Sequence, residues 1–360
     1  MKVLGIETSC DDTAAGVVED GLHVLSSVVA SQLDIHGPFG GVVPELASRS
    51  HLEAVGPVVE AALRDAGVGF GDLDGIAATR GPGLVGSLLV GLSTGKALAF
   101  AHSLPILGVN HLEAHIRSVF LDHPDLTYPL LALVVSGGHT SLYFLPGEGT
   151  YEHLAWTRDD AAGEAFDKVA KYLGFGYPGG PVVDRLAARG NDSAYPFSLP
   201  RMTDGSMDFS FSGLKTAALY TMKKRGIEPR NSRVTGLASG PDLETSASQV
   251  TCDLFASFQK AVVGHLVQRT VALAAQTGAT TVIVSGGVAC NSRLRADIAA
   301  AGKQHGFGVA WPRPIYCSDN GAMVATTGCL MLREGRIGDL DMEADPSLRL
   351  GEMPPPVATP

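Results

Sequence analysis

Two hairpins of the same design, one in each half of the chain, constrain the fold more than any other feature. Residues 2–18 read as a buried strand (KVLGIE), a polar turn and a second strand. Residues 130–145 repeat this order, with LLALVV as the buried strand and Ser-Gly-Gly-His as the turn. A repeated strand–turn–strand unit predicts a duplicated α/β architecture with two lobes that share a cleft.

Helical patterns fill the chain between and after the hairpins. A third apolar strand is expected at 281–284, and Asp159 and Asp160 are expected to cap the helix that follows them. Pro57 is expected to break the first long helix. The predicted helices are 44–66, 83–102, 111–121, 159–173, 246–276, 291–305 and 319–333.

No proline- or serine-rich linker separates the two halves, so the domain boundaries follow the hairpins. Residues 1–128 are expected to form the N-terminal α/β lobe. Residues 129–340 are expected to form the C-terminal lobe, with a helical and irregular insert at about 159–245. Residues 341–360, which end in GEMPPPVATP, are expected to be a disordered tail.

The composition excludes several classes of protein. Hydrophobic residues make up 45% of the 360 residues and charged residues 18%, which argues against a disordered chain or a coiled coil. The five cysteines are odd in number and have no CxxC spacing, as expected for a reducing compartment. No signal peptide and no apolar run near the ~18 residues of a membrane span are found. A cytoplasmic location without a membrane association is therefore expected.

The net charge of −10 taken alone argues against a partner that is a nucleic acid. The charge is unevenly distributed, however, because residues 185–233 contain nine basic and four acidic side chains. Phe197, Phe209 and Phe211 are interleaved with them. This segment could contact a polyanion, although a solvated insert is the alternative.

Two Val-Ser-Gly-Gly turns, at 135–138 and 284–287, each follow a buried strand. Glycine lets backbone N–H groups approach an anion without obstruction by a side chain. One such turn would most simply be an ordinary turn, but two in corresponding places favour a nucleotide held between the lobes. Neither GxGxxG nor GxxxxGK[ST] is present, so neither a dinucleotide fold nor a P-loop is indicated.

The string His111-Leu-Glu-Ala-His115 places two imidazoles on one face of a helix, where they could share a divalent metal. A structural histidine pair is the alternative. Asp319 is a candidate third ligand, but spacing alone cannot select it from 37 acidic residues. Asp11 and Asp12 follow the first strand and could act as a base or through a metal, or could simply cap the turn.

The helical string DDAAGEAFDKVAK carries charged side chains one turn apart, which in the simplest reading form a solvated face with ion pairs. The Pro-Gly-Gly-Pro turn at 178–181 then begins another helix, whose N–H groups could meet a ligand.

These strings together resemble one family, the bacterial tRNA N6-adenosine threonylcarbamoyltransferases (TsaD) of the glycoprotease-like group. They occur in family order and span about residues 1–335, whereas 226–245 and the segment after about 340 match nothing. The strings are IETSCD (6–11), GGVVPELASR (40–49), GPGLVGSLLVG (81–91), HLEAH (111–115), VSGGHT (135–140), DDAAGEAFDK (159–168), YPGGP (177–181), FSFSGLK (209–215), SGGVACN (285–291) and SDNGAM (318–323).

The resemblance implies a two-lobed, duplicated actin/hexokinase/Hsp70-like (ASKHA) ATPase fold with a central cleft. It implies transfer of a threonylcarbamoyl group from threonylcarbamoyl-AMP to the N6 amine of the adenosine 3′-adjacent to the anticodon, in tRNAs reading codons that begin with A, with release of AMP. The implied partners are tRNA, a smaller inactive paralogue similar to TsaB, and a P-loop ATPase similar to TsaE.

The resemblance also implies a set of site residues. One divalent metal, Fe(II) or Zn(II), would be held by His111, His115 and Asp319. Threonylcarbamoyl-AMP, or ATP or AMP, would be bound by Val134, Val135, Ser136, Gly137, Gly138, Asp167, Gly180, Asp184 and Asn291. Asp11 and Asp12 are the catalytic candidates, and Asp11 is expected to orient the amine or to accept its proton. Many relatives carry glutamate where this chain has Asp12.

Three other functions remain open from the sequence. An enzyme of the same fold could hydrolyse ATP or transfer phosphate. A metallopeptidase is a weaker candidate, because HLEAH lacks the glutamate of HExxH next to the first histidine. A non-catalytic scaffold would not need the two histidines and Asp319.

Overall fold

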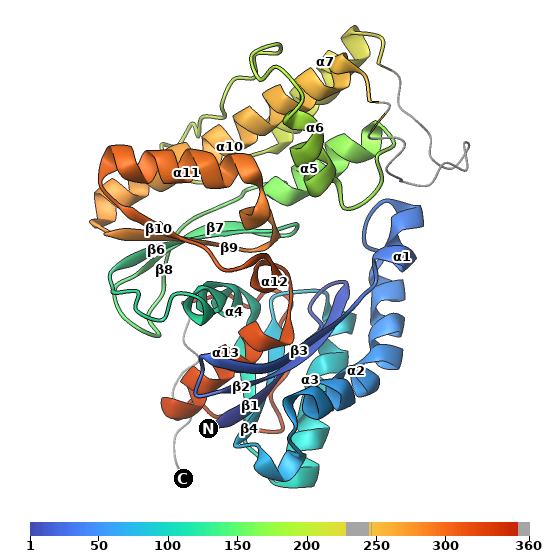
Figure 1. Ribbon diagram of the computed structural model, residues 1–360, viewed down its shortest axis with the longest axis vertical. Helices are drawn as coiled ribbons and strands as arrows, with labels where there is room; N and C mark the ends of the chain where they lie inside the picture. The colour runs from blue at the N-terminus through green and yellow to red at the C-terminus, as the bar shows by residue number, and fades with distance from the viewer. Residues whose placement is uncertain (228–244, 246, 352–360) are drawn as a thin grey trace.

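The computed structural model describes residues 1–227, 245 and 247–351. It contains two five-stranded sheets with the same topology (Figure 1). The first has the order β3 (His23–Ser31), β2 (Asp12–Glu19), β1 (Lys2–Glu7), β4 (Gly75–Gly81) and β5 (Ile106–Asn110). The second has the order β8 (Glu152–Trp156), β7 (Thr140–Leu145), β6 (Leu130–Val135), β9 (Thr281–Ser285) and β10 (Gly308–Ala310).

The strand pairing repeats as well as the order. In each sheet an antiparallel hairpin is followed by a third antiparallel strand, and two parallel strands join on the other side. The central strands β1 and β6 are buried along their length, which explains why both read as continuous apolar runs. The duplicated α/β architecture is therefore confirmed.

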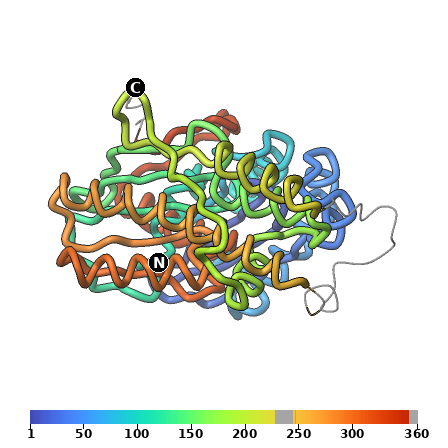
Figure 2. The backbone as a smooth tube through the Cα atoms, turned by 90° about the horizontal axis from the view of Figure 1, so that it is seen from above, coloured from blue at the N-terminus to red at the C-terminus, as the bar shows by residue number. Residues whose placement is uncertain are grey.

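Helices form layers outside and between the sheets (Figure 1). Helices α2 (Pro44–Ala66) and α3 (Val85–His102) cover the first sheet on its outer face, and α4 (His111–Ser118) and α13 (Gly321–Arg333) lie between the two sheets. Figure 2 looks onto the outer layer of the second sheet. That layer contains α5 (Ala162–Tyr172), α6 (Gly179–Ala187), α7 (Ser212–Lys224), α10 (Gln249–Thr277) and α11 (Ser292–His305). Two short segments, α1 (Leu33–His36) and α12 (Pro314–Cys317), connect these layers.

Helix α13 packs on β1 and β2 of the first sheet, although it follows the second sheet in the chain. The last helix therefore brings the SDNGAM string back to the N-terminal lobe. Both lobes contribute to the layer between the sheets, and this is where the two histidines of α4 also lie.

Helix α2 is continuous through Pro57, so the expected break is wrong. A proline removes one backbone hydrogen bond, to the carbonyl four residues earlier. Pro57 and Glu53 are both exposed, so water can reach the carbonyl that loses its partner.

Residues 341–351 are held by contacts with both lobes. Lys96 Nζ donates a hydrogen bond to the Met342 carbonyl (2.9 Å), Arg80 Nε donates to the Glu343 carbonyl (2.9 Å), and Leu350 is buried. The disorder expected from residue 341 onward therefore does not apply to 341–351, and residues 352–360 lie outside the described residues. The expected insert at 159–245 is described only in part, because residues 228–244 lie outside the described residues.

The capping role expected of Asp159 and Asp160 for α5 is also wrong. Ala161 precedes α5, and Glu164 Oε2 accepts the Ala161 N–H (3.3 Å). Asp159 instead caps α7, since its Oδ1 accepts the N–H groups of Phe211 (2.8 Å) and Ser212 (3.2 Å). Asp160 pairs with Lys168 and Lys215.

Replacing Asp159 with alanine is expected to destabilise the protein by about 1 kcal/mol, because the first turn of α7 loses its cap. Burial raises the pKa of Asp159, but its hydrogen bonds from Ser210, Ser212 and the backbone outweigh burial and lower it. Its contribution is therefore present above the unfolded pKa of 3.8 and is lost as the pH falls below that value. Urea unfolding of wild type and D159A at pH 7 and pH 3 should show a difference at pH 7 that shrinks at pH 3. An equal difference at both pH values would contradict this assignment.

No helix in the described parts of the chain is long and apolar enough to cross a membrane.

Candidate metal centre and substrate cleft

The two histidines and Asp319 come together because caps fix the starts of their helices. Asn110 ends β5 and accepts the N–H groups of Leu112 (2.9 Å) and Glu113 (3.3 Å), so α4 begins at the end of the strand. His111 and His115 then lie one turn apart on the same face. Asn320 caps α13 in the same way, and Asp319 directly precedes this cap.

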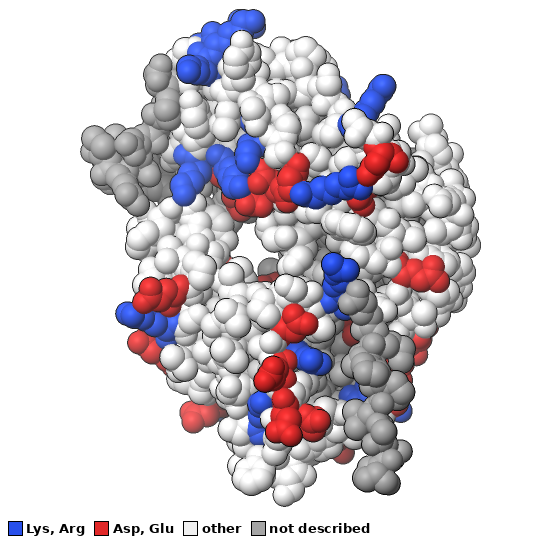
Figure 3. Space-filling view, turned by 180° about the vertical axis from the view of Figure 1, so that it is seen from behind, with Lys and Arg blue, Asp and Glu red and all other residues white. Residues whose placement is uncertain are grey.

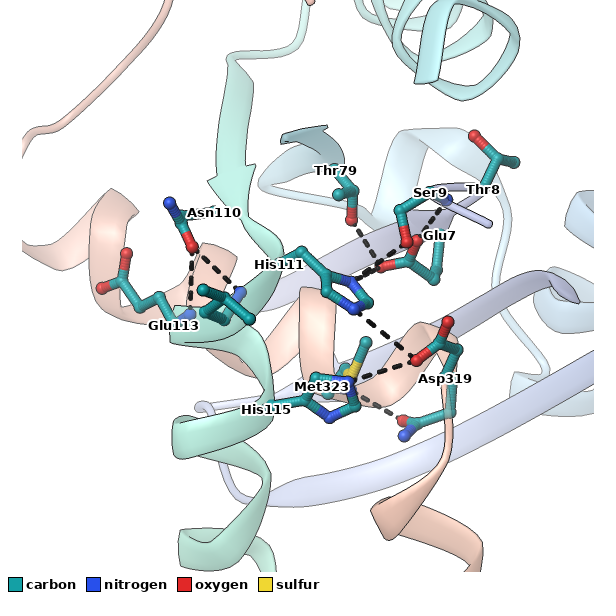
Figure 4. A network of polar contacts seen from close by, with 12 residues as sticks. Glu7, Thr8, Ser9, Thr79, Asn110, His111, Glu113, His115, Asp319 and Met323 are labelled. Carbon is teal, nitrogen blue, oxygen red and sulfur yellow. Dashed lines mark hydrogen bonds and ion pairs between the residues drawn. The ribbon is translucent and has the colours of Figure 1, made fainter. Parts of the chain in front are cut away.

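Side chains of His111, His115 and Asp319 converge in the layer between the sheets (Figure 4). One ligand atom from each lies within 4.8 Å of the others. Asp319 Oδ1 is 3.2 Å from His115 Nε2 and 3.7 Å from His111 Nε2. His115 is fully buried, and its Nδ1 has no hydrogen-bond partner. A buried polar atom without a partner lowers the stability of the fold, so the ring is expected to have a function other than packing. Two imidazoles and a carboxylate fit Fe(II) or Zn(II).

Glu7 lies behind His111 and orients its ring (Figure 4). Glu7 Oε2 is 3.1 Å from His111 Nδ1 and accepts a hydrogen bond from Thr79 Oγ1 (2.7 Å). Its other oxygen accepts the Ser9 N–H (2.5 Å). A carboxylate on the second nitrogen fixes the tautomer of a metal-binding histidine, leaving Nε2 for the metal. Glu7 was not among the residues predicted for the site, although it ends the first buried strand.

The charged side chains of this centre shift one another's pKa values. Burial lowers the pKa of His111, but Glu7 and Asp319 outweigh it and raise this pKa to about 9. Burial raises the pKa of Asp319, but the neighbouring histidines hold it well below its usual value. Without a metal, the carboxylates therefore stabilise a proton on His111.

Replacing Glu7 with glutamine is expected to lower metal affinity by about 10- to 100-fold, the usual effect of losing such an outer partner. The substitution nearly preserves volume, so the Thr79 contact can persist while the negative charge is lost. Competition of the protein with a metal-binding dye should measure the change. Glu53→Gln, on the exposed face of α2, is the matched control. Wild-type metal affinity in E7Q would contradict the role assigned to Glu7.

The first Val-Ser-Gly-Gly turn faces the metal centre. Val134 and Val135 are buried in β6, and their positions pair with Ser141 and Thr140 of β7. The turn continues through Ser136 to Gly137 and Gly138, and the space beside both glycines is open. A ligand could therefore approach the backbone there, as the prediction requires.

His139 ends this turn, and its ring centroid is 6.0 Å from that of His111. Burial, with the neighbouring His111 and His115, lowers the pKa of His139 to about 3. His139 was not predicted to lie beside the candidate metal centre, although it is inside the VSGGHT string.

Asp167 and Gly180 were both expected to bind the nucleotide, but they are hydrogen-bonded to each other. Asp167 Oδ1 accepts the N–H groups of Gly179 (2.7 Å) and Gly180 (3.2 Å) at the start of α6. These N–H groups are therefore already partnered, and Asp167 organises the Pro-Gly-Gly turn. Burial raises the pKa of Asp167 to about 6, although the two hydrogen bonds oppose this shift.

Asp184 and Asn291 hold α6, α10 and α11 together. Asp184 accepts hydrogen bonds from the Ser292 N–H (3.0 Å) and hydroxyl (2.8 Å). Asn291 Oδ1 caps α11 by accepting the Leu294 N–H (2.9 Å), and its Nδ2 donates to Gln259 Oε1 (3.2 Å). Both residues thus have structural contacts, and their contact with a nucleotide stays a prediction.

Asp11 and Asp12 lie on the opposite lobe from Asp167. The Tyr177 hydroxyl donates to Asp11 Oδ2 (3.2 Å) and so joins the α5–α6 loop to the first hairpin. Burial, together with the charge of Asp319, raises the pKa of Asp12 to about 7. Tyr177, inside the YPGGP string, was not predicted as a site residue.

An opening separates the two lobes in the space-filling view (Figure 3). Lys171 Nζ on α5 crosses between the lobes and donates to the Phe39 carbonyl (2.8 Å). The structure thus has the expected two lobes, with the metal-binding cluster, the Val-Ser-Gly-Gly turn and Asp11 contributed from both.

Comparison with known proteins decides the family. The profile of the TsaD family, described as tRNA N6-adenosine threonylcarbamoyltransferase, matches residues 23–326. This chain belongs to the TsaD family.

Relatives within the TsaD family match almost the whole chain. A tRNA N6-adenosine threonylcarbamoyltransferase of Symbiobacterium thermophilum is 51% identical over 350 residues, covering 97% of both chains. The protein of the same name from Syntrophotalea carbinolica is 50% identical, covering 96% of this chain and 95% of its own. That from Clostridium perfringens is 47% identical, covering 97% and 98%.

Solved structures with low sequence identity support the fold alone. HypF of T. kodakarensis is similar over 92% of this chain and 48% of its own, with a TM-score of 0.59 and 16% identity. The activator of 2-hydroxyisocaproyl-CoA dehydratase from Clostridium difficile has a TM-score of 0.50 and 12% identity, covering 93% and 97%. TsaD proteins and these neighbours share the two-lobed ASKHA architecture predicted from the sequence.

Proposed function

We propose that this chain transfers the threonylcarbamoyl group of threonylcarbamoyl-AMP to the N6 amine of the adenosine 3′-adjacent to the anticodon, in tRNAs reading codons that begin with A. AMP is the second product. The observation that carries this proposal is the near-full-length identity of about half to curated tRNA N6-adenosine threonylcarbamoyltransferases. The convergence of His111, His115 and Asp319 supports it, because the site that the family resemblance implies is complete.

His111, His115 and Asp319 would hold one divalent metal, for which we propose Fe(II), with Zn(II) as the alternative. When bound, it supplies Lewis-acid polarisation and neutralises negative charge. Glu7 keeps the His111 ring in place through Nδ1. The SDN turn presents Asp319 because α13 is anchored on the first sheet.

The nucleotide would lie along the Val-Ser-Gly-Gly turn, where open space beside Gly137 and Gly138 leaves room for a phosphate. Backbone N–H groups there would stabilise the charge that develops as the bond from the carbamoyl carbon to the phosphate oxygen breaks. We further propose that Asn291, Asp184, Asp167 and Gly180 shape the adenosine side of this site. The hydrogen bonds that each of them makes, to one another or to Ser292, Leu294 and Gln259, keep it rigid.

The amine of the tRNA forms a bond to the carbamoyl carbon and must lose a proton. Asp11 is the proposed acceptor or orienting group, and the Tyr177 hydroxyl fixes its carboxylate. Asp12 supplies a second carboxylate beside it, one methylene shorter than the glutamate found at this position in many relatives.

An enzyme that hydrolyses ATP or transfers phosphate is the main alternative, since the ASKHA fold supports that chemistry. It predicts ADP as product without a requirement for the acyl-adenylate. A metallopeptidase or a scaffold is less well supported, because the HExxH glutamate is missing and the metal-binding cluster is complete.

We also propose that the chain acts in the cytoplasm with tRNA, a TsaB-like paralogue and a TsaE-like P-loop ATPase. Partners could add basic surface to that of residues 185–233, since the net charge of this chain is −10.

A reconstituted reaction tests the proposal. Threonine, bicarbonate, ATP, an adenylate-forming enzyme, the two partners and unmodified tRNA should yield threonylcarbamoyladenosine, detected by mass spectrometry of digested tRNA, only when this chain is present. Release of AMP in equal amount should accompany it. ADP formation by this chain alone, in the absence of the P-loop ATPase, together with no tRNA modification in the full mixture, would favour the alternative and overturn the proposal.

A further inference from the structure

We propose that Cys290 and Cys317 form a peroxide-sensitive dithiol site, and that its oxidation to a disulfide ties the segment after β9 to the segment before α13. Nothing in the transfer reaction uses either thiol. The first lies in the 3-10 turn η4 (Gly287–Cys290), and the second ends α12.

The two thiols lie close together although they are 27 positions apart in the chain. Helix α12 packs against η4, and the sulfur atoms of Cys290 and Cys317 both lie within 4.0 Å of Arg295 Nη2. Cys317 is fully buried, and its Sγ also donates to the Pro312 carbonyl (3.4 Å). A disulfide therefore joins two sulfur atoms that already lie beside the same guanidinium group.

A fixed cation lies beside both sulfurs. Arg295 Nη2 is 4.0 Å from Cys290 Sγ and 3.7 Å from Cys317 Sγ. Its Nε donates to the Ala289 carbonyl (2.6 Å), and its guanidinium lies over the Trp311 ring, 5.3 Å from the centroid. These two contacts hold the positive charge in place, where it favours a thiolate.

Cys290 is the thiol that an oxidant would meet first. It is exposed, whereas Cys252, Cys317 and Cys329 are buried. The neighbouring Cys317 thiol, with the charge of Arg295, lowers the pKa of Cys290 to about 7, although burial opposes this shift. By contrast, burial and the neighbouring Asp11 raise the pKa of Cys10 well above its usual value. An exposed cysteine with a thiolate and a second thiol nearby is typical of a reversible oxidation site.

The oxidant is hydrogen peroxide. The Cys290 thiolate attacks one peroxide oxygen, the O–O bond breaks, and Cys290 becomes a sulfenic acid while hydroxide leaves. Cys317 sulfur then attacks the Cys290 sulfur, the S–O bond breaks, and the leaving oxygen departs as water with the Cys317 proton. Two thiols and one peroxide thus give one disulfide and two waters.

The disulfide would form close to Asp319 in the chain. Cys317 precedes Asp319 by two residues, and α12 begins the passage from the second sheet back to the first. A covalent bond to η4 would fix this passage and displace the SDN turn. Oxidation is therefore expected to weaken the metal-binding cluster.

The test uses the full-length, metal-loaded protein, reduced and then treated with hydrogen peroxide. After alkylation with iodoacetamide and digestion without reductant, mass spectrometry should find a peptide pair joined through Cys290 and Cys317, which dithiothreitol separates. C290S and C317S should lack this pair. Absence of the pair in wild type, or conversion of Cys290 to sulfinic acid without it, would overturn the proposal.

A second variant tests the activating cation. R295M should lower the rate of Cys290 alkylation at pH 7 by about three- to fivefold, because less of the thiol is ionised and the rate only partly follows ionisation. Lys303→Met, on the same helix and exposed, is the matched control. An unchanged rate in R295M would remove Arg295 from the site.

The amount of bound metal measures the effect of the disulfide on the metal centre, independently of threonylcarbamoyl transfer. Oxidised wild type should lose at least about half of its bound metal on dialysis and recover metal binding after reduction, whereas oxidised C290S should keep its metal. A complete disulfide with unchanged metal content would overturn the coupling.

Discussion

Replacing both His111 and His115 with alanine is expected to abolish stoichiometric metal binding and to slow threonylcarbamoyl transfer by at least about 1000-fold. Only Asp319 would remain of the three converging ligands, and a single carboxylate does not hold a transition metal tightly. Loss of several kcal/mol of charge stabilisation corresponds to a rate loss of this order. Metal content should be measured by mass spectrometry of the purified protein, and transfer by single-turnover modification of tRNA.

Two further variants make this result interpretable. His305→Ala removes an exposed histidine in the last turn of α11 and should retain metal and activity. Asp319→Asn nearly preserves the shape of its side chain, so it separates loss of the ligand from loss of packing around the buried His115. The metal assignment would fail if the double histidine variant kept one metal per chain and transferred at the wild-type rate.

Much of the fold could be predicted from local patterns. The two hairpins at 2–18 and 130–145 anticipated two sheets with the same strand order, because each central strand is apolar on both faces. The spacing of four in HLEAH anticipated that both imidazoles lie on one face. Asp319 could not be selected in this way, since it reaches α4 only because α13 returns to the first sheet.

The parts that could not be predicted depend on contacts between distant residues. The expected cap at Asp159 was wrong because its carboxylate accepts the N–H groups of Phe211 and Ser212, about fifty residues later. The N–H groups of Gly179 and Gly180 were expected to be open to a ligand, but both already donate hydrogen bonds to Asp167 on α5. Neither partner is visible in local spacing.

Replacing Gly321 with alanine is expected to lower the free energy of unfolding by about 3 kcal/mol and to reduce metal affinity by about tenfold. The first turn of α13 lies directly on the backbone of the first sheet. A Cβ at Gly321 would be 2.1 Å from the Ala15 carbonyl carbon and 2.2 Å from the Gly16 nitrogen. Gly5 meets the same helix, since its Cβ would be 2.3 Å from the Ala325 nitrogen.

Backbone atoms cannot rotate away as a side chain can, so α13 itself must move in this variant. Asp319 lies two residues before Gly321 and would move with it, which links stability to the metal centre. Urea unfolding of the metal-free protein should measure the first effect, and metal titration the second. Gly264→Ala is the matched control, because its Cβ meets only Leu199 at 3.9 Å and alanine favours the helix α10. Equal unfolding midpoints for the two variants would show that α13 does not need this close approach.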